Sequence, residues 1–228
     1  MIDLTGIVQQ VSVVALPLIF AITLHEAAHG YVAWAMGDDT ARRLGRISLN
    51  PLRHVDPFGT IILPAMLMVM GSFLFGWAKP VPVNFSRLHH PRSDMVWVAL
   101  AGPGTNFVLA LVSAVLWGFT DPQGGALALW FRAALEVSIL VNVILMVFNL
   151  IPLPPLDGGR VAVGVLPDAL ALPLARLERY GLLILIGAFF LLPMIGREIG
   201  VPLDVTGWVL GPPVRYAIEL IQILSGNL

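Results

Sequence analysis

The chain has 228 residues, of which 57% are hydrophobic and only 12% are charged. Soluble globular domains carry about 25% charged residues, so this composition excludes an ordinary soluble enzyme and predicts a protein that lives in lipid. There is no cysteine, which excludes disulfides, thiolate metal sites and a cysteine nucleophile. The basic residues form no tract, which argues against a nucleic-acid partner and leaves the lipid bilayer as the expected environment.

Long apolar runs define the expected architecture, because a membrane-spanning helix needs about 20 apolar residues. We expect an all-α polytopic membrane protein with one domain over residues 1–228, a core of three helices at about 7–165, and C-terminal helices over 180–228. A loop or interfacial piece is expected at Leu166–Arg179, and the amphipathic stretch Val214–Leu224 is expected to lie in the membrane interface. The expected spans are Ile7–Met36, Met95–Phe119, Leu127–Ile151 and a shorter, tilted Tyr180–Ile195.

The stretch between the first two spans is harder to interpret. Phe58–Trp77 is long enough to cross, but Pro64 and Gly71 interrupt it, so it either spans or dips into the membrane and returns. In the Pro80–Val83 segment that follows, alternate prolines remove the backbone donors from one edge only, and Val81 and Val83 keep theirs on the other. This pattern indicates either an edge strand that pairs with an extended substrate peptide or a proline-rich turn.

The motif His-Glu-Ala-Ala-His, residues 25–29, lies in the second half of the first apolar run. An i,i+4 spacing puts His25 and His29 on one helix face, where they can share a metal ion. Glu26 is placed to take a proton from water on that metal. Because ionisable groups are costly inside a membrane, this cluster indicates a functional site.

A third ligand is expected because zinc in catalytic sites is held by three protein groups and keeps one position open. Asp157 follows the third long span in Leu156–Arg160, where Gly158 and Gly159 permit a tight or left-handed backbone that aims the carboxylate back into the protein. The alternative is that Asp157 caps the next helix. His54 and Asp56 are rival ligands in a polar loop.

Asn106 places an amide at membrane depth, after the small-residue stretch that begins at Ala101. It is a candidate to hold the substrate backbone or the oxyanion, and helix–helix hydrogen bonding is an equally open interpretation. The structural alternative for Gly102 and Gly104 is close helix packing.

The distribution of basic residues between the two membrane faces tests whether Phe58–Trp77 spans or is re-entrant. If the histidines and Asp157 meet, residues 37–94 must begin and end on one membrane face, and Phe58–Trp77 is re-entrant. That arrangement leaves ten basic residues on the active-site face and only Arg132 and Arg197 opposite, with Arg215 in the C-terminal stretch, whereas a spanning segment gives six against six. The positive-inside rule then makes the active-site face cytoplasmic. The ten are Arg42, Arg43, Arg46, Arg53, Lys79, Arg87, Arg92, Arg160, Arg176 and Arg179.

These motifs together resemble the site-2 protease family of intramembrane zinc metalloproteases over roughly residues 20–165. The resemblance rests on His25–Gly30, Ala101–Asn106 and Asn149–Arg160. It implies a zinc ion held by His25, His29 and Asp157, Glu26 as catalytic base, assistance from Asn106, and a membrane-associated β-structured loop after the first helix. It also implies a compact prokaryotic member without a PDZ or CBS domain, in the plasma membrane.

The predicted function is hydrolysis of a peptide bond in or near a transmembrane segment of a substrate protein, with one Zn²⁺ per chain. The alternatives are a non-catalytic zinc-binding membrane protein or metal carrier, and a hydrolase of soluble peptides at the membrane face. A carrier is expected to show repeated halves and a polar path through the membrane, whereas this chain shows one polar cluster and no repeat.

Overall fold

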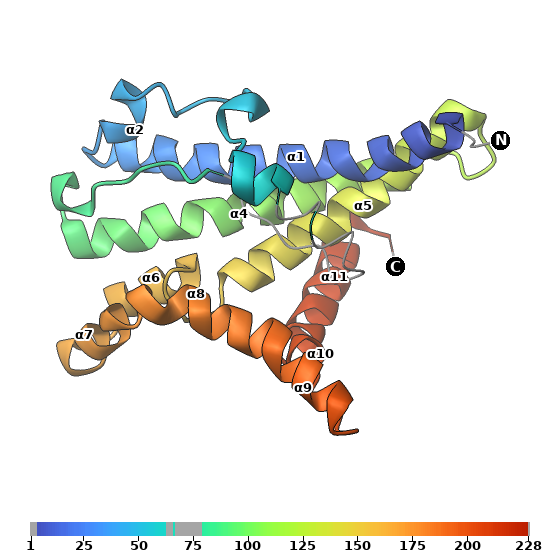
Figure 1. Ribbon diagram of the computed structural model, residues 1–228. Coiled ribbons are helices and arrows are strands. Elements are labelled where there is room, and N and C mark those ends of the chain that lie inside the picture. The colour runs from blue at the N-terminus through green and yellow to red at the C-terminus, as the bar shows by residue number, and fades with distance from the viewer. Residues whose placement is uncertain (1–3, 63–65, 67–78, 228) are drawn as a thin grey trace.

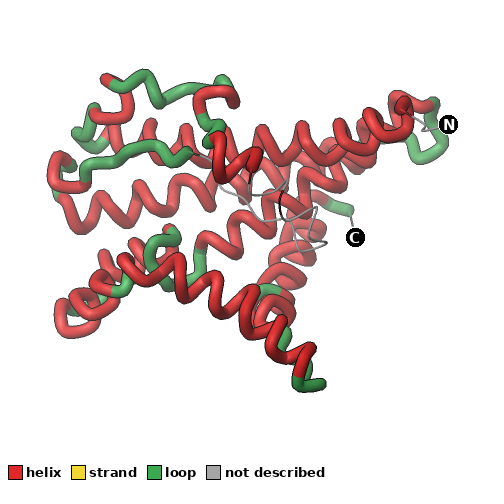
Figure 2. Tube along the Cα trace, viewed as in Figure 1, coloured by secondary structure: helices red, strands yellow, loops and turns green. Residues whose placement is uncertain are grey.

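The computed structural model describes residues 4–62, 66 and 79–227, and within these ranges all regular structure is helical (Figure 2). Four helical segments are long and apolar enough to cross a membrane: Val11–Ala35, Pro91–Gly118, Ala126–Asn149 and Glu178–Glu198. The expectation of an all-α polytopic membrane protein is therefore confirmed.

Helix α1 (Leu4–Ala35) is the longest described element, runs between α4 and the loop that carries α2 in Figure 1, and contains Pro17. It ends where Gly37 takes a φ of +107°, a left-handed conformation that glycine adopts without steric cost. The amides of Gly37 and Asp38 then donate back to the carbonyls of Trp34 and Ala33, at 3.1 and 2.9 Å. This pair of bonds satisfies the last carbonyls of the helix and turns the chain sharply.

Helices α4 (Pro91–Gly118) and α5 (Ala126–Asn149) pack with α1 to form a three-helix core (Figure 1). The predicted boundaries of these spans lie within a few residues of the observed ones. Alanines at the contacts, such as Ala110 and Ala114 on α4, let the helices approach closely where Val143 of α5 is fully buried.

The C-terminal third of the chain is mostly helical, with α6 (Asp157–Val165), α7 (Asp168–Arg176), α8 (Glu178–Ile186), η4 (Gly187–Leu191), α9 (Leu192–Glu198), α10 (Val205–Val209) and α11 (Gly211–Ser225). Helix α7 lies where a loop or interfacial piece was expected, and α8, η4 and α9 together form the fourth span. Helix α11 buries Ala217 and Ile221 in the same core cluster as Val143, so its apolar face packs on α4 and α5.

Residues 37–90 leave and rejoin the bundle at the same end. The amide of His89 donates to the carbonyl of Met36 at 2.9 Å, which ties the start of α4 to the end of α1. Within this stretch, the amide of Lys79 donates to the carbonyl of His54 at 2.8 Å, so the chain departs from His54 and returns beside it. Its short helices are α2 (Thr40–Arg43), η1 (Pro51–Arg53), η2 (Pro57–Ile62) and η3 (Phe85–Arg87).

The re-entrant interpretation of Phe58–Trp77 concerns residues that lie mostly outside the described ranges. Whether this segment spans or is re-entrant therefore stays a prediction. The described residues 79–84 are extended and form no strand, so the expected β-structure is not seen in the part of the loop that the structure describes.

Candidate metal centre and active site

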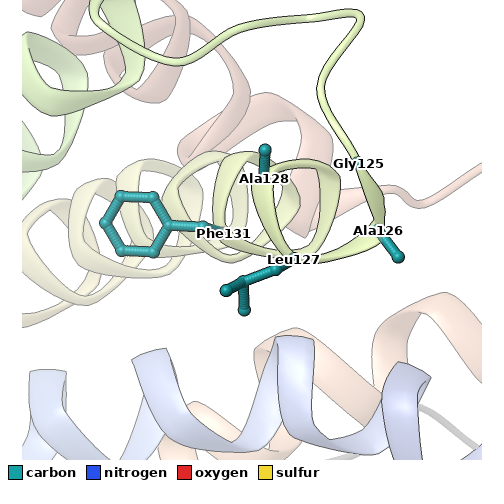
Figure 3. A pocket seen from close by; sticks show the side chains of 5 residues that line it. All are labelled: Gly125, Ala126, Leu127, Ala128 and Phe131. Carbon is teal, nitrogen blue, oxygen red and sulfur yellow. The ribbon is translucent and has the colours of Figure 1, made fainter.

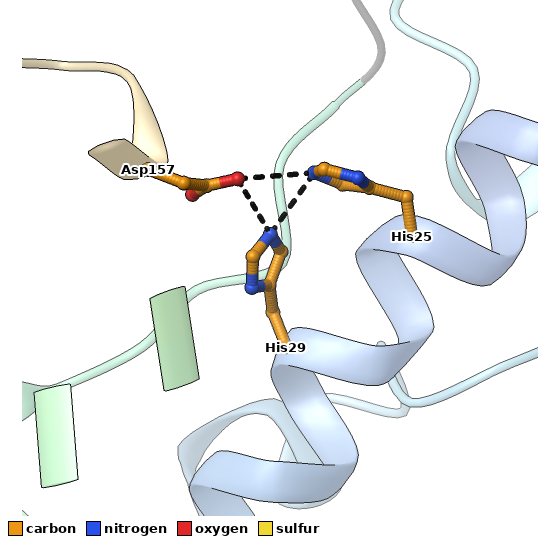
Figure 4. A group of neighbouring side chains, drawn as sticks. All are labelled: His25, His29 and Asp157. Atoms are coloured by element: carbon orange, nitrogen blue, oxygen red, sulfur yellow. Dashed lines mark hydrogen bonds and ion pairs between the residues drawn. The ribbon is translucent and has the colours of Figure 1, made fainter. Parts of the chain in front are cut away.

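Two histidines and one aspartate meet at the end of the bundle where α1 ends and α4 begins. His25 and His29 lie one turn apart on α1, and Asp157 is the first residue of α6 (Figure 4). The Nε2 atoms of the histidines are 3.0 Å apart, and each lies 3.3 Å from Oδ2 of Asp157. All three side chains are buried, and within the described ranges they form the one cluster of metal-ligating type.

The hydrogen bond at Nδ1 of each imidazole determines whether Nε2 turns a lone pair or a proton toward the centre of the cluster. Nδ1 of His29 lies 2.7 Å from the carbonyl oxygen of Val98, which can only accept, so Nδ1 carries the proton and Nε2 presents a lone pair. Nδ1 of His25 donates to Oδ1 of Asn106 at 2.6 Å, which leaves its Nε2 as a lone pair too. Two imidazole lone pairs and a carboxylate oxygen therefore point at one another.

A cation between these atoms would replace the repulsion among the two lone pairs and the carboxylate oxygen with attraction. Oδ2 of Asp157 is buried and accepts no hydrogen bond from any described group. The observed separations of 3.0 and 3.3 Å are close to the edge of a zinc tetrahedron, about 3.3 Å for metal–ligand bonds of about 2.0–2.1 Å. The residues present thus fit a zinc ion in number, chemistry and spacing.

Gly102 of α4 supplies the room for that ion. A Cβ at this position would lie 2.5 Å from Nε2 of His29 and 2.6 Å from Nε2 of His25. No ordinary contact is that short, so any side chain here would intrude on the ligand atoms. By contrast, a Cβ at Gly104 meets nothing within 4 Å.

Two glycines place Asp157, for a reason other than the one predicted. Gly158 and Gly159 lie in the first turn of α6, and neither has a positive φ. A Cβ on Gly158 would lie 2.2 Å from the carbonyl oxygen of Leu150, and one on Gly159 would lie 2.1 Å from the nitrogen of Pro154. Close approach to the preceding turn, not left-handed backbone, is therefore what these positions require.

The carboxylate of Asp157 is charged as well as buried. Burial by itself raises the pKa of this group, and positive charge at the facing Nε2 atoms of His25 and His29, supplied by protons there or by a bound cation, holds the pKa below its ordinary value. Asp157 is therefore available as an anionic ligand.

Glu26 lies beside the cluster and is held by the loop that precedes α4. Its Oε2 accepts a hydrogen bond of 2.7 Å from the backbone amide of Val81. The Val81 side chain is buried against α1 at Gly30, where an added Cβ would lie 3.0 Å from Cγ1 of Val81. The amide of Asn84 donates to Oδ2 of the buried Asp38 at 2.6 Å, which anchors the other end of this extended segment.

The pairing of Val81 and Val83 with a substrate strand stays a prediction. In the observed arrangement the amide of Val81 is already engaged by Glu26, and the side chain of Val83 packs against the cluster of Ala33, Leu88 and Val98. If the Val81 amide keeps its bond to Glu26, a substrate strand has to pair through other backbone groups of this segment.

Asn106 is completely buried and its amide is committed to the protein. Its Oδ1 accepts from His25, and its Nδ2 donates to Oδ1 of Asn142 at 2.7 Å. Asn106 thus touches the face of His25 that points away from the cluster. Of the two interpretations left open by the sequence, this geometry supports helix–helix hydrogen bonding, and it offers no free group to an oxyanion.

The rival ligands His54 and Asp56 do not join the cluster. Nε2 of His54 lies 2.8 Å from the carbonyl oxygen of Ser48, and Oδ1 of Asp56 accepts from the amide of Gly59 at 2.6 Å. Sequence reasoning did not assign Gly102, the Val98 carbonyl or Asn142 to the site. Only Gly102 had a local signal, its place in the Ala101–Asn106 stretch, and that signal was interpreted as a possible packing feature.

The open apolar depressions of the surface lie elsewhere. One is lined by five residues at the start of α5, at the far end of that helix from Asn149 (Figure 3): Gly125, Ala126, Leu127, Ala128 and Phe131. It contains no titratable side chain, so it offers no competing catalytic centre.

Comparison with known proteins places this chain in a family. The model of peptidase family M50 matches residues 119–194, which include Asp157 but not the histidines. A Bacillus subtilis protein described as "Putative zinc metalloprotease YwhC" is 39% identical over 194 residues, which cover 79% of this chain and 85% of that relative. A Mycolicibacterium smegmatis protein with the same description and the name Rip2 is 30% identical, over 78% of this chain and 66% of the relative. Rip2 of Mycobacterium tuberculosis strain H37Rv is 29% identical, over 84% and 67%.

No solved structure matches the chain. The family nevertheless follows from the Bacillus subtilis relative, which is 39% identical and is covered over 85% of its length, and it agrees with the motifs in the sequence and with the buried histidine–aspartate cluster. The chain belongs to peptidase family M50, the site-2 proteases, and is an integral membrane zinc metalloprotease that acts on protein substrates in the bilayer.

Proposed function

We propose that His25, His29 and Asp157 hold the catalytic zinc and that Glu26 is the general base. The observation that carries this proposal is the convergence of three lone-pair atoms, 3.0–3.3 Å apart, on the space that Gly102 leaves open. Glu26 lies next to His25 in the chain, and its Oε2 is fixed by the Val81 amide. Its other carboxylate oxygen is then left to meet a water or a leaving nitrogen.

Zinc at this site would polarise the scissile carbonyl and lower the pKa of water toward about 7. Glu26 accepts a proton from the attacking water and then gives it to the leaving nitrogen as the C–N bond breaks, so that a peptide bond and one water become a carboxylic acid and an amine. The Nδ1 donors of His25 and His29 are tied to Asn106 and Val98, which keeps both imidazoles oriented throughout.

The proposed charge balance suits a buried site. One Zn²⁺ with the carboxylates of Asp157 and Glu26 sums to zero. This neutrality moderates the cost of holding charges in a medium of low dielectric constant.

The proposed substrate is a transmembrane segment that presents one peptide bond in an extended form. His25 and His29 lie within the span Val11–Ala35, so a bond that reaches them lies at membrane depth. A helix hides its carbonyls in internal hydrogen bonds, and local unwinding is therefore required. The backbone near Val81 and Val83 is the candidate surface for holding the unwound strand.

The proposed location is a prokaryotic plasma membrane, with the active site toward the cytoplasm. The support is the excess of basic residues, ten against two, on the face where the histidines and Asp157 lie. Contacts between elements agree with that grouping, because Arg92 at the start of α4 pairs with Asp168 of α7 at 2.6 Å.

The function is tested with purified wild type and Glu26→Gln. Each protein is assayed for bound zinc and incubated with a panel of single-span membrane proteins. Zinc in both proteins with cleavage only by the wild type is the expected result, because Gln keeps the shape of the side chain but cannot accept the proton. Equal cleavage by both would remove Glu26 as the base.

A further inference from the structure

A chain of directed hydrogen bonds runs from the metal cluster into the contact between α4 and α5. Nδ1–H of His25 donates to Oδ1 of Asn106, and Nδ2 of Asn106 donates to Oδ1 of Asn142 at 2.7 Å. Nδ2 of Asn142 then donates to the backbone carbonyl of Ser138 at 2.8 Å. Asn106 is 0% exposed and Asn142 is 1% exposed, so water does not compete for these bonds.

The direction of this chain is determined at its far end. A backbone carbonyl such as that of Ser138 can only accept, so Asn142 must turn its NH₂ group toward Ser138 and its oxygen toward Asn106. Asn106 must then turn its NH₂ group toward Asn142 and its oxygen toward His25. His25 must therefore carry its proton on Nδ1.

We propose that Asn142 is a positioning residue of the metal centre: acting through Asn106, it fixes the tautomer and ring orientation in which Nε2 of His25 offers its lone pair to the metal. This inference rests on the proposed function, because it takes zinc to bind between His25, His29 and Asp157. It adds a residue that touches neither the metal nor the substrate.

Without the oxygen of Asn142, the orientation of Asn106 is held only by the long hydrogen bond, 3.4 Å, from its Nδ2 to the backbone carbonyl of Ala21. A rotated Asn106 would present its NH₂ group to His25, which favours a proton on Nε2 and removes that lone pair from the centre. His29 needs no such relay, because the Val98 carbonyl fixes its tautomer directly. Loss of Asn142 should therefore weaken zinc binding through His25 alone.

The test is the zinc affinity of the purified full chain, measured by competition with a chromophoric chelator. Asn142→Leu is expected to bind zinc about 10- to 100-fold more weakly, the usual range for a lost partner of a metal-ligating histidine. Asn142→Asp is expected to stay close to wild type, since its protonated carboxyl group can donate to the Ser138 carbonyl while its other oxygen accepts from Asn106. Asn142→Ala is the second variant if the leucine variant does not fold.

Ser113→Ala is the matched control. Its hydroxyl is 2.8 Å from that of Ser138, so it loses a hydrogen bond in the same contact between α4 and α5 but leaves the relay to His25 intact. Its zinc affinity should equal that of wild type. A general loosening of the contact would instead weaken zinc binding in both variants, and that result would overturn the proposal.

A double variant tests whether Asn142 affects zinc binding through Asn106 or independently of it. If Asn142 acts through Asn106, then Asn106→Leu with Asn142→Leu binds zinc no more weakly than Asn106→Leu alone. Losses that multiply would overturn the relay, as would a folded Asn142→Leu with wild-type affinity. Absence of zinc from the wild type itself would instead overturn the metal assignment of the proposed function.

Discussion

The backbone amide of Val81 donates a 2.7 Å hydrogen bond to Oε2 of Glu26. These residues are 55 positions apart, and the contact joins the proposed base on α1 to the extended segment that precedes α4. The segment is fixed at both ends, by the bond of Lys79 to His54 and by that of Asn84 to Asp38. It can therefore orient one carboxylate oxygen and leave the other for catalysis.

Val81→Pro should lower the cleavage rate about 10- to 100-fold while zinc binding persists. Proline removes the N–H, and the flanking Pro80 and Pro82 already favour an extended backbone, so the segment need not refold. A hydrogen bond to a charged group contributes about 1.5–3 kcal/mol, which corresponds to this range of rates. Steady-state cleavage and zinc content are measured together. Val81→Ala keeps the N–H and should lose much less activity, so equal losses in the two variants would contradict this role.

Gly102→Ala should abolish zinc binding and cleavage, because its methyl group would lie 2.5–2.6 Å from Nε2 of both histidines. Gly104→Ala is the matched control on the same helix, where a Cβ meets nothing within 4 Å. Zinc content and thermal unfolding of both variants provide the readout. A Gly102→Ala protein that keeps its zinc would show that the ion lies elsewhere.

Asp38→Asn should destabilise the protein at neutral pH and progressively less in acid. Burial raises the pKa of Asp38, but its bonds from Thr40 and Asn84 outweigh burial, so the pKa in the folded state lies below the ordinary value. A group with a lowered folded pKa stabilises the protein above its unfolded pKa, about 3.9, and the contribution disappears as pH falls through the folded pKa. Thermal unfolding of wild type and variant from pH 7 to pH 3 measures the effect. A difference that does not shrink toward pH 3 would assign the loss to packing instead.

Removal of zinc by a chelator should stop cleavage, and added zinc should restore it. The helical fold should survive, because the core of α1, α4 and α5 is held by buried apolar and small residues such as Ala110 and Val143. The unfolding temperature should nevertheless fall, since two imidazole lone pairs and the Asp157 carboxylate then face one another without a cation. Circular dichroism with and without the chelator tests this, and loss of helix on chelation would contradict it.

Much of the fold followed from the sequence, because spans are specified by long runs of apolar residues. The first, second and third core helices lie where Ile7–Met36, Met95–Phe119 and Leu127–Ile151 predicted them. Helix α7 and the packing of α11 were missed, because short amphipathic segments give the same pattern whether they cover protein or lipid. The one-domain organisation stays a prediction.

The site, too, was only partly predictable from the sequence. The i,i+4 spacing of His25 and His29 is a local signal, and the structure brings Asp157 to them as expected. Val98, which bonds to His29, and Asn142, which bonds to Asn106, are brought to the site by which helix faces meet, and a single sequence does not show that. The catalytic role of Asn106 stays a prediction, and its contact with Asn142, 36 residues away on another helix, was not visible in the sequence.

The most direct test of this account is X-ray absorption at the zinc edge of the purified wild-type protein. The account predicts four light-atom ligands at about 2.0–2.2 Å, with the outer-shell scattering of two imidazole rings. A spectrum with one imidazole or none, or a protein that binds no zinc at all, would contradict the assignment of His25, His29 and Asp157 as the metal ligands.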